Sequence, residues 1–492
     1  MNAQRAKTLG IFAAVLTLFA WGWWSFGFPP PKPLISEPGS DESTPGTSNG
    51  RIVIRGNNAA MENDAKRQAE QDLGKRLFEE RYPDAIMGFS TWQFSPETFF
   101  AKSIAGTLPE VIGVFATEAA NLLDRRLCAD ITEQVQGWEH GSQLNMNLLQ
   151  PMMRDGRIYG LPTMPGFYVM LMFYNKDMFR DAGIVDERGE PVAPDTWDDF
   201  TTVAKRLTDR TRGIAGFGIL GETGGNGWHF LNWVWQAGGD FEKKLPDGRW
   251  ISVFHEPPAV QALQFVKDLR WKHDVLQRNV LASNDELFQL FASGRIAMAI
   301  FTMEYLQNLV DKYEMPLQRI GIALLPAGPG GRANQIGGGF ALINPRLTGL
   351  RKQRAFDMLV LDADLQVIDQ KMKLLHSQGR RVGIPAVPIF KPEYQAKYDA
   401  VIDKYRNLPA QRELMEAAAK AARFEPARES QTLYRDYLGP AVQDVLVSRN
   451  ANPGALLDSA SKRFQARVLD ALNRQAAQPV QLQQPLSLQA KK

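Results

Sequence analysis

The sequence predicts an α/β protein in which helices cover both faces of a parallel or mixed β-sheet. Between residues 51 and 115, apolar strand patterns alternate with helical patterns, which is typical of such sheets. The alternation resumes after residue 213 and predicts a second sheet. The 492 residues are 44% hydrophobic and 23% charged, a composition that suits two or three globular cores.

The first sheet is predicted from strands and helices that follow one another closely. Strands are expected at residues 51–55, 85–89 and 111–115, with a polar helix ending near Glu80 and another beginning after Pro96. In sheets of this kind, ligands bind beyond the carboxyl ends of the strands. The segments that follow these strands are therefore candidates for a binding site.

The segment LMFYNKDMFRDAGI, residues 171–184, predicts a strand, a short helix and a turn. Leu171 to Tyr174 form an apolar and aromatic run, and Asn175 can cap a helix that extends from Lys176 to Ala182. Gly183 is then a stop signal for that helix.

A second helix is predicted just downstream, where Thr196 and Asp199 have the spacing of a capping box. One face of this helix is apolar at helical spacing, which predicts that it packs on a core. That face consists of Trp197, Phe200, Val203, Ala204 and Leu207.

The second sheet is predicted from two later segments. GIAGFGIL, residues 213–220, has the pattern of a strand, and residues 296–301 form another strand after a helix that ends at Gly294. Ser283 and Glu286 have capping-box spacing at the start of that helix. Beyond Pro392 nearly all patterns are helical, and residues 476–492 are expected to be a frayed tail.

The N-terminus contains an uncharged run from Thr8 to Phe28 that is predicted to enter a membrane. In a helix these 21 residues would span about 31 Å, roughly one bilayer core. Arg5 and Lys7 precede the run, so the remainder of the chain is expected to be exported. Residues 1–28 are either a retained membrane anchor or a removable signal peptide. Residues 29–50, rich in Pro, Ser, Gly and Thr, are expected to be a flexible linker.

Several classes of function are disfavoured by the sequence. A formal charge of +3 with dispersed basic residues argues against nucleic-acid binding. The single cysteine, Cys128, excludes an intrachain disulfide and a cysteine-built metal site. GFGILG has the spacing of a dinucleotide-binding loop, but its glycines fall inside a strand pattern and are followed by ETGGNG rather than directly by a helix, so a glycine-rich strand and loop without a cofactor is expected. The five histidines lack metal-ligand spacing.

The segment DGRIYGLPTMPGFYVMLMFYNKDMFRDAGI, together with PDTWDDFTTVAKRLT, resembles the extracellular solute-binding proteins of family 1, the carbohydrate-binding components of ABC importers. FEERYPDAIMGF, AGTLPEVIGVF, VWQAGGDF, LFASGRIAMAI, LPAGPGGRANQIGGGFALI and GIPAVPIF match in the same order. The resemblance implies a non-enzymatic, monomeric protein of the two-lobed periplasmic-binding-protein-like fold (type II), with a hinge and an interlobe ligand cleft. It implies that residues 51–165 and 334–390 form lobe I and residues 166–333 and 391–475 form lobe II.

The resemblance also implies a sugar ligand outside the cytoplasm and an ABC importer permease as partner. Because sugars present apolar faces and many hydroxyls, their clefts need aromatic rings beside polar side chains. Trp92, Trp228 and Glu304 are the first candidates, since each follows a glycine-rich stretch or a strand end. The other candidates are Gln93, Thr117, Glu118, Phe167, Tyr168, Glu222, His229 and Tyr305.

Two other functions stay open at this point. A retained N-terminal anchor would favour a membrane-tethered ligand sensor of the same fold. A secreted carbohydrate hydrolase is the alternative enzyme, because paired catalytic carboxylates can lie far apart in a sequence.

Overall fold

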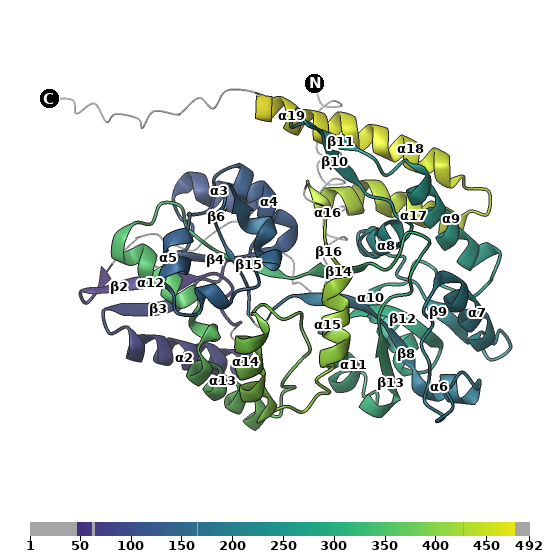
Figure 1. Cartoon of the computed structure of the whole chain (residues 1–492), viewed down its shortest axis with the longest axis horizontal. Helices are drawn as coiled ribbons and strands as arrows, with labels where there is room; N and C mark the ends of the chain where they lie inside the picture. Colours follow the sequence, from purple (N-terminus) through teal and green to yellow (C-terminus); the bar gives the residue numbers. More distant parts are fainter. Residues whose placement is uncertain (1–46, 62–63, 165, 427, 478–492) are drawn as a thin grey trace, which may run out of the picture. The chain divides into compact units, whose positions relative to one another are not determined.

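The computed structural model describes residues 47–61, 64–164, 166–426 and 428–477, all within one compact unit of the chain. Two six-stranded sheets with surrounding helices form this unit, so the predicted α/β class with a second sheet is confirmed (Figure 1). Residues 1–28, most of the predicted linker and nearly all of the predicted tail lie outside the described residues. Within the described ranges, no helix has the length and apolar character needed to cross a membrane.

The first sheet contains the three strands predicted near the start of the folded region. Its strands are β1 (Thr47–Ser48), β2 (Arg51–Gly56), β3 (Ala85–Phe89), β4 (Val111–Phe115), β7 (Leu161–Pro162) and β15 (Gly339–Ile343). The order is β1-β2-β4-β15-β7, with β3 paired to β2. β2 is parallel to β3 and β4, whereas β15 is antiparallel to β4 and β7. The sheet is therefore mixed, as predicted.

Helices of the first lobe, which is built on this sheet, include the polar helix predicted to end near Glu80 and the helix predicted after Pro96. They include α2 (Ala65–Arg81), α3 (Pro96–Ala105), α4 (Ala116–Asp124), α12 (Gly349–Leu359) and α13 (Leu365–Ser377). Ser95 caps α3 through its side chain, and Pro96 occupies the first turn, where its missing N–H has no cost.

The end of the predicted linker is a strand rather than a flexible segment. β1 pairs antiparallel with β2, with Thr47 opposite Ile52. Asn49 and Gly50 connect the two strands with φ values of 51° and 78°. Asn-Gly favours this tight hairpin turn because both residues tolerate positive φ. The linker prediction is therefore wrong for residues 47–50.

The central strand of the second sheet contains residues 171–174, the strand predicted at the start of segment 171–184. The strands of this sheet are β8 (Tyr168–Asn175), β9 (Ala215–Gly218), β12 (Ile296–Thr302), β13 (Ile320–Ala323), β14 (Asn334–Gly337) and β16 (Ala422–Phe424). The order is β16-β14-β8-β12-β9, and β13 also pairs with β8. β8 is buried on both faces, because Val169, Leu171 and Phe173 pack in one hydrophobic cluster while Met170 and Met172 pack in another.

The predicted helix starts after β8 follow local capping chemistry. Asn175 caps α6 (Lys176–Asp181) by accepting hydrogen bonds from the N–H groups of Asp177 and Met178. Gly183 follows with φ of 64°, a conformation that glycine adopts without strain. Thr196 and Asp199 form the predicted capping box at the start of α7 (Trp197–Leu207). These predictions are confirmed. Each depends on a capping residue that acts on backbone groups only a few residues away, so a short stretch of sequence is sufficient to predict the helix start.

The predicted apolar face of α7 is buried except at one position. Trp197, Phe200, Ala204 and Leu207 are buried, whereas Val203 is only half-buried. Thr201 is buried too. Its hydroxyl is satisfied there because it donates to the carbonyl of Trp197 in the preceding turn.

The glycines of GFGILG permit close packing in β9 and the turn that follows. A Cβ atom on Gly216 would lie 1.9 Å from the carbonyl oxygen of Ala204, and one on Gly221 would lie 1.7 Å from that of Val280. The predicted glycine-rich strand and loop are confirmed, because β9 ends at Gly218 and residues 219–224 form no helix. α8 (Gly225–Gln236) starts inside the GGNG segment, with a glycine instead of a side-chain cap at its N-terminus.

The predicted capping box at Ser283 is only half formed. Ser283 accepts from the N–H of Glu286 at the start of α10 (Asn284–Ala292). The Glu286 carboxylate instead accepts from the side-chain amide of Asn279 at 2.8 Å. The strand predicted after Gly294 is confirmed as β12, one residue longer than expected.

The two predicted lobe boundaries at residues 334 and 391 differ from the observed packing. β14 pairs with β8, so residues 334–337 belong to the second sheet, and the chain leaves it at Gly338, where φ is 142°. α14 (Pro392–Asp403) packs on α13, and the Tyr394 hydroxyl donates to the carbonyl of Ala363 at 2.7 Å. α14 therefore belongs to the first lobe, and the chain returns to the second sheet through α15 (Arg412–Lys420) and β16.

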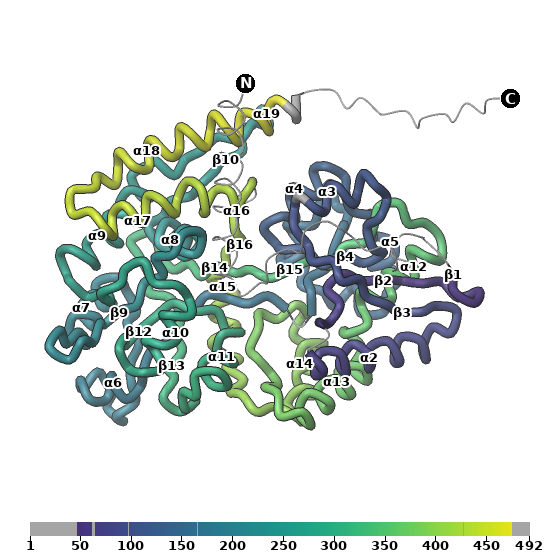
Figure 2. The backbone as a smooth tube through the Cα atoms, turned by 180° about the vertical axis from the view of Figure 1, so that it is seen from behind, coloured from purple at the N-terminus to yellow at the C-terminus, as the bar shows by residue number. Residues whose placement is uncertain are grey.

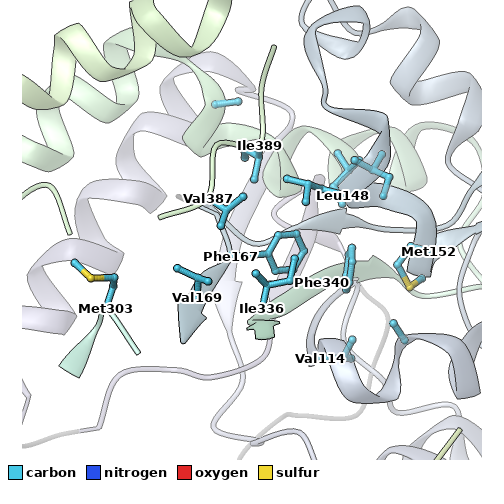
Figure 3. Close-up of a cluster of buried hydrophobic side chains, with 14 of the residues drawn as sticks. Val114, Leu148, Met152, Phe167, Val169, Met303, Ile336, Phe340, Val387 and Ile389 are labelled. Atoms are coloured by element: carbon cyan, nitrogen blue, oxygen red, sulfur yellow. The ribbon is translucent and has the colours of Figure 1, made fainter. Parts of the chain in front are cut away.

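An apolar core surrounds the two strand connections between the sheets (Figure 3). The ring of Phe167 lies 5.3 Å from those of both Phe340 and Phe424. The carbonyl of Phe167 also accepts a hydrogen bond from the N–H of Val387 at 2.8 Å. Because these residues come from different crossing segments, this core joins the lobes at the hinge.

The second lobe, which is built on the second sheet, carries a helical layer formed by distant parts of the chain. α9 (Pro257–Trp271) contacts α8, and both contact α17 (Gly439–Val447). The view from behind shows α17 and α18 (Pro453–Phe464) beside these earlier helices (Figure 2). Among the described residues beyond Pro392, β16 is the only strand, so the predicted helical run is largely confirmed.

Candidate ligand-binding site

Neighbouring strands of the second sheet bring four residues to one edge. In the registered pairs, Thr302 of β12 lies opposite Met170 of β8, and Gly337 of β14 lies opposite Tyr168. Glu304 lies just beyond the end of β12, and Glu425 lies just beyond the end of β16. The sheet order therefore places Glu304, Tyr168, Gly337 and Glu425 in sequence along this edge.

Tyr168 lies over Gly337, and the absence of a side chain there makes room for the ring. A Cβ atom on Gly337 would be 2.7 Å from the Tyr168 hydroxyl oxygen. Burial raises the pKa of the Tyr168 hydroxyl well above its ordinary value, and the charges of Glu425 and Glu304 raise it further. Tyr168 therefore stays a neutral phenol between two carboxyl groups.

Glu425 has one oxygen bonded within the protein and one that is not. Its Oε1 accepts from the indole N–H of Trp228 and from the side-chain amide of Gln335 at 3.1 Å. Its Oε2 is buried and has no hydrogen-bond partner among the described residues. Burial raises the pKa of Glu425 to about 7, and the nearby charge of Glu118 acts in the same direction.

Glu304 is a second carboxyl group with an unpartnered oxygen. It precedes α11 (Tyr305–Asp311), and within the described ranges its buried Oε2 has no hydrogen-bond partner. Burial raises the pKa of Glu304 to about 7. The neighbouring Tyr305 packs its ring 5.0 Å from that of Phe288, and burial raises the pKa of Tyr305 to about 12.

Aromatic rings surround the Glu425 carboxyl group. The rings of Trp228 and Tyr168 meet edge to face at 6.3 Å. Tyr434, in the π-helix η6 (Leu433–Leu438), has its pKa raised by burial and by the charge of Glu425. Aromatic faces and a carboxyl group are thus combined at one point, as carbohydrate recognition requires.

The first lobe contributes the first turn of α4. Thr117 accepts a hydrogen bond from the side-chain amide of Gln431 at 3.3 Å, and Glu118 is buried beside Asn121. Asp124, at the end of α4, forms an ion pair with Arg428. These contacts connect the first lobe to the segment that follows β16.

A cavity of about 130 Å³ lies between α4 and that segment. Its lining residues are Ala116, Thr117, Ala120 and Pro151 from the first lobe, and Phe424, Glu425 and Pro426 from the other side. A larger cavity of about 260 Å³ lies between α17 and α18, lined by residues such as Tyr437 and Arg463. We place the candidate site at the smaller cavity, because only that one adjoins the strand ends and the buried carboxyl groups.

The predicted site residues divide into two groups. The structure brings together Tyr168, Trp228, Glu304, Tyr305, Thr117 and Glu118. Phe167 is instead fully buried in the hinge core. His229 faces away from solvent in α8, and burial lowers its pKa to about 4, which keeps the ring neutral. Glu222 lies in the turn before α8, where its backbone N–H donates to the carbonyl of Ala282.

Trp92 and Gln93 lie in the first lobe beyond β3. The indole N–H of Trp92 donates to the Thr98 hydroxyl at 3.0 Å, and its ring meets that of Phe94 at 6.3 Å. Gln93 is exposed. Phe115, which ends β4 and packs edge to face on Phe94, is 49% exposed, so it offers an aromatic surface that the sequence reasoning missed.

Glu425, Gln335 and Tyr434 were also missed. Glu425 follows a strand of only three residues in a segment of helical pattern, and Gln335 reaches it through the pairing of β14 with β16. The signal available in sequence was the ARFEP segment, where an aromatic residue and a carboxylate precede a proline. In the part of the chain that the structure describes, no group of three or more His, Cys, Asp or Glu side chains could hold a metal ion.

Comparison with known proteins identifies the family. Residues 68–345, more than half of the chain, match the bacterial extracellular solute-binding protein family. A protein of Brucella abortus (strain 2308) and one of Brucella suis biovar 1 (strain 1330), both named as binding proteins, are each 25% identical over 394 residues. These matches cover 79% of this chain and 87% of each relative.

Solved structures share the fold at low sequence identity. The GacH receptor of Streptomyces glaucescens, known unliganded and with acarbose, gives a TM-score of 0.63 at 16% identity and covers 84% of this chain and 97% of its own. Maltose-bound MalE3 of T. maritima gives 0.63 at 22% identity, covering 84% and 99%. UgpB of Mycobacterium tuberculosis, solved with glycerophosphocholine, gives 0.64 at 17% identity, covering 87% and 100%.

The resemblance seen in the sequence and its implied two-lobed fold are thus confirmed: the chain belongs to the bacterial extracellular solute-binding protein family.

Proposed function

We propose that this chain captures a sugar or oligosaccharide between its two lobes, outside the cytoplasm, and delivers it to an ABC importer without altering it chemically. The observation that carries the proposal is the group formed by Trp228, Tyr168 and Glu425 at the strand ends of the second lobe, facing α4 of the first lobe. Aromatic rings match the apolar faces of sugars, and the carboxyl oxygens accept from their hydroxyls.

The ligand is held by both lobes in this proposal. The cavity of about 130 Å³ is smaller than the roughly 300–1,000 Å³ of typical small-molecule sites, so an oligosaccharide requires the lobes to move apart. Closure onto the ligand then adds contacts from Thr117 and Glu118 to those from the second lobe. The lobes assigned on this basis are residues 51–165 with 339–403, and 166–338 with 412–475.

Residues 1–28 direct export in this proposal, either as a membrane anchor or as a signal peptide, and the residues that follow them connect to the folded body. The protein acts as a monomer that docks on importer permease subunits. The family match and the acarbose and maltose complexes of the structural neighbours support this role.

A thermal-shift screen of the folded body against a carbohydrate panel tests the proposal. A ligand at about a hundred times its Kd should add roughly 2.7 kcal/mol to the free energy of unfolding. Trp228→Ala should abolish the shift, whereas Trp271→Ala should keep it, because Trp271 is a half-buried tryptophan in α9 that bonds to the carbonyl of Val445. Recovery of the ligand unchanged by mass spectrometry supports binding without catalysis. A panel with no stabilising carbohydrate would contradict the proposal.

A further inference from the structure

Two carboxyl groups of the candidate site, those of Glu304 and Glu425, form no ion pair with basic side chains of the described residues. Among the described residues, no Lys or Arg forms an ion pair with Glu304 or Glu425, although the chain forms many such pairs elsewhere. The nearest basic side chain after β16, Arg428, is engaged with Asp124. Both Glu304 and Glu425 therefore lack a countercharge within the part of the chain that the structure describes.

Each of these carboxyl groups also keeps one buried oxygen without a donor. For Glu425, both protein donors reach Oε1, and Oε2 is left open in a residue that lines the cavity. A buried acceptor without a partner is costly, because it has lost its water without gaining a hydrogen bond. A donor carried by the ligand would remove that cost.

The surroundings of Glu425 favour a charged donor over a neutral one. With a neutral ligand the buried carboxyl group keeps its proton up to about pH 7, because ionisation would leave a buried charge without compensation. A protonated amine would supply both a donor and a countercharge, so it would stabilise the ionised carboxylate and displace the proton of Glu425; the aromatic rings of Trp228, Tyr168 and Tyr434 lie around the same carboxyl group, and aromatic faces attract cations.

The Glu425 carboxyl group and Glu304 are well separated along the sheet edge. Three strand intervals of roughly 4.8 Å place the two backbone positions about 14 Å apart. The carboxyl groups thus offer two separate acceptors along an extended ligand.

We propose that Glu425 Oε2 receives a protonated amine of the ligand, so that the solutes captured by this chain are amine-bearing carbohydrates rather than neutral ones. This inference rests on the proposed function, because it assigns a ligand class to the same site. It makes Glu425 the residue that determines specificity, while Trp228 and Gln335 position its carboxyl group by holding Oε1.

Matched disaccharides that differ in one kind of group test this assignment. Isothermal titration at pH 6.5 compares the β-1,4-linked glucosamine disaccharide with its N-acetylated form and with cellobiose, which carries hydroxyls in place of the amines. We expect the amine form to bind at least about tenfold more tightly than either neutral form. The same comparison with α-linked aminated and neutral disaccharides covers the other linkage.

Two substitutions test whether the preference for the amine depends on the charge of Glu425. Glu425→Gln keeps an acceptor for Trp228 and Gln335 but removes the charge, so it should reduce the preference for the amine at least tenfold. Glu416→Gln, which removes an exposed carboxylate from α15, should leave the preference intact. Melting temperatures of both variants verify that they fold.

Three outcomes distinguish the two proposals. Tight amine binding that depends on Glu425 supports the inference. Neutral carbohydrates that bind as tightly as aminated ones, or a preference unchanged by Glu425→Gln, overturn it and leave the proposed function standing if Trp228→Ala abolishes binding. If no carbohydrate of either class binds, both proposals fail.

Discussion

Replacing Glu425 by glutamine should change how the stability of the protein depends on pH. Burial raises the pKa of this carboxyl group from the ordinary 4.5 to about 7 in the folded protein. Between these two pH values the unfolded chain ionises while the folded protein holds the proton. Stability contributed by the protonated form is therefore lost as the pH rises through this interval, and the loss is complete above about pH 7.

The interval between 4.5 and about 7 corresponds to roughly 3 kcal/mol of unfolding free energy for Glu425. Glutamine cannot ionise, and its side-chain oxygen can still accept from Trp228 and Gln335. Glu425→Gln should therefore lack the part of the pH-dependent loss of unfolding free energy that comes from Glu425. Glu304, whose pKa is also raised to about 7 by burial, should continue to weaken the variant as the pH rises.

Urea denaturation at pH 5, 6, 7 and 8 measures the effect. The wild-type protein should lose roughly 2–3 kcal/mol more than Glu425→Gln between pH 5 and pH 8. Glu416→Gln serves as the control and should follow the wild-type profile, because Glu416 is exposed. Parallel profiles for the wild-type protein and Glu425→Gln would refute the reasoning that Glu425 is buried without a countercharge.

The remaining predictions concern closure, the other site residues and export. Arg428→Ala removes the ion pair with Asp124 between the lobes and should weaken ligand binding about three- to tenfold, with a larger radius of gyration by small-angle scattering; an unchanged radius and affinity would exclude a role in closure. Glu304→Ala should lower ligand affinity without lowering the melting temperature, whereas a lowered melting temperature with affinity retained would assign Glu304 to the core. Protease added outside spheroplasts should digest the folded body, and protection would contradict export directed by residues 1–28.

Local signals in the sequence were sufficient for much of the fold. Asn175 and the Thr196–Asp199 pair act on backbone groups two or three residues away, and both helix starts form as predicted. The strands at 85–89 and 111–115 were predicted at their observed limits because alternation and turn residues define them. Asn49-Gly50 was an equally local hairpin signal, which the composition of the surrounding linker obscured.

The site was harder to predict because its members meet only through long-range pairing. Glu425 reaches the sheet edge because Phe424 pairs with Ile336, and neither residue carries a local sign of that partnership. Adjacent residues also lie in different environments: Phe167 packs in the hinge core, whereas Tyr168 lies near the carboxyl groups of Glu304 and Glu425. In an alternating strand the side that becomes core depends on what packs there, which periodicity alone does not specify.

A crystal structure of the protein with a carbohydrate identified by thermal shift is the most direct test of the central claim that the ligand binds between the lobes. We predict that the sugar will contact Trp228 and Glu425 from the second lobe and Thr117 from the first. Ligand density confined to the cavity between α17 and α18, with Trp228 and Glu425 uncontacted, would contradict this account.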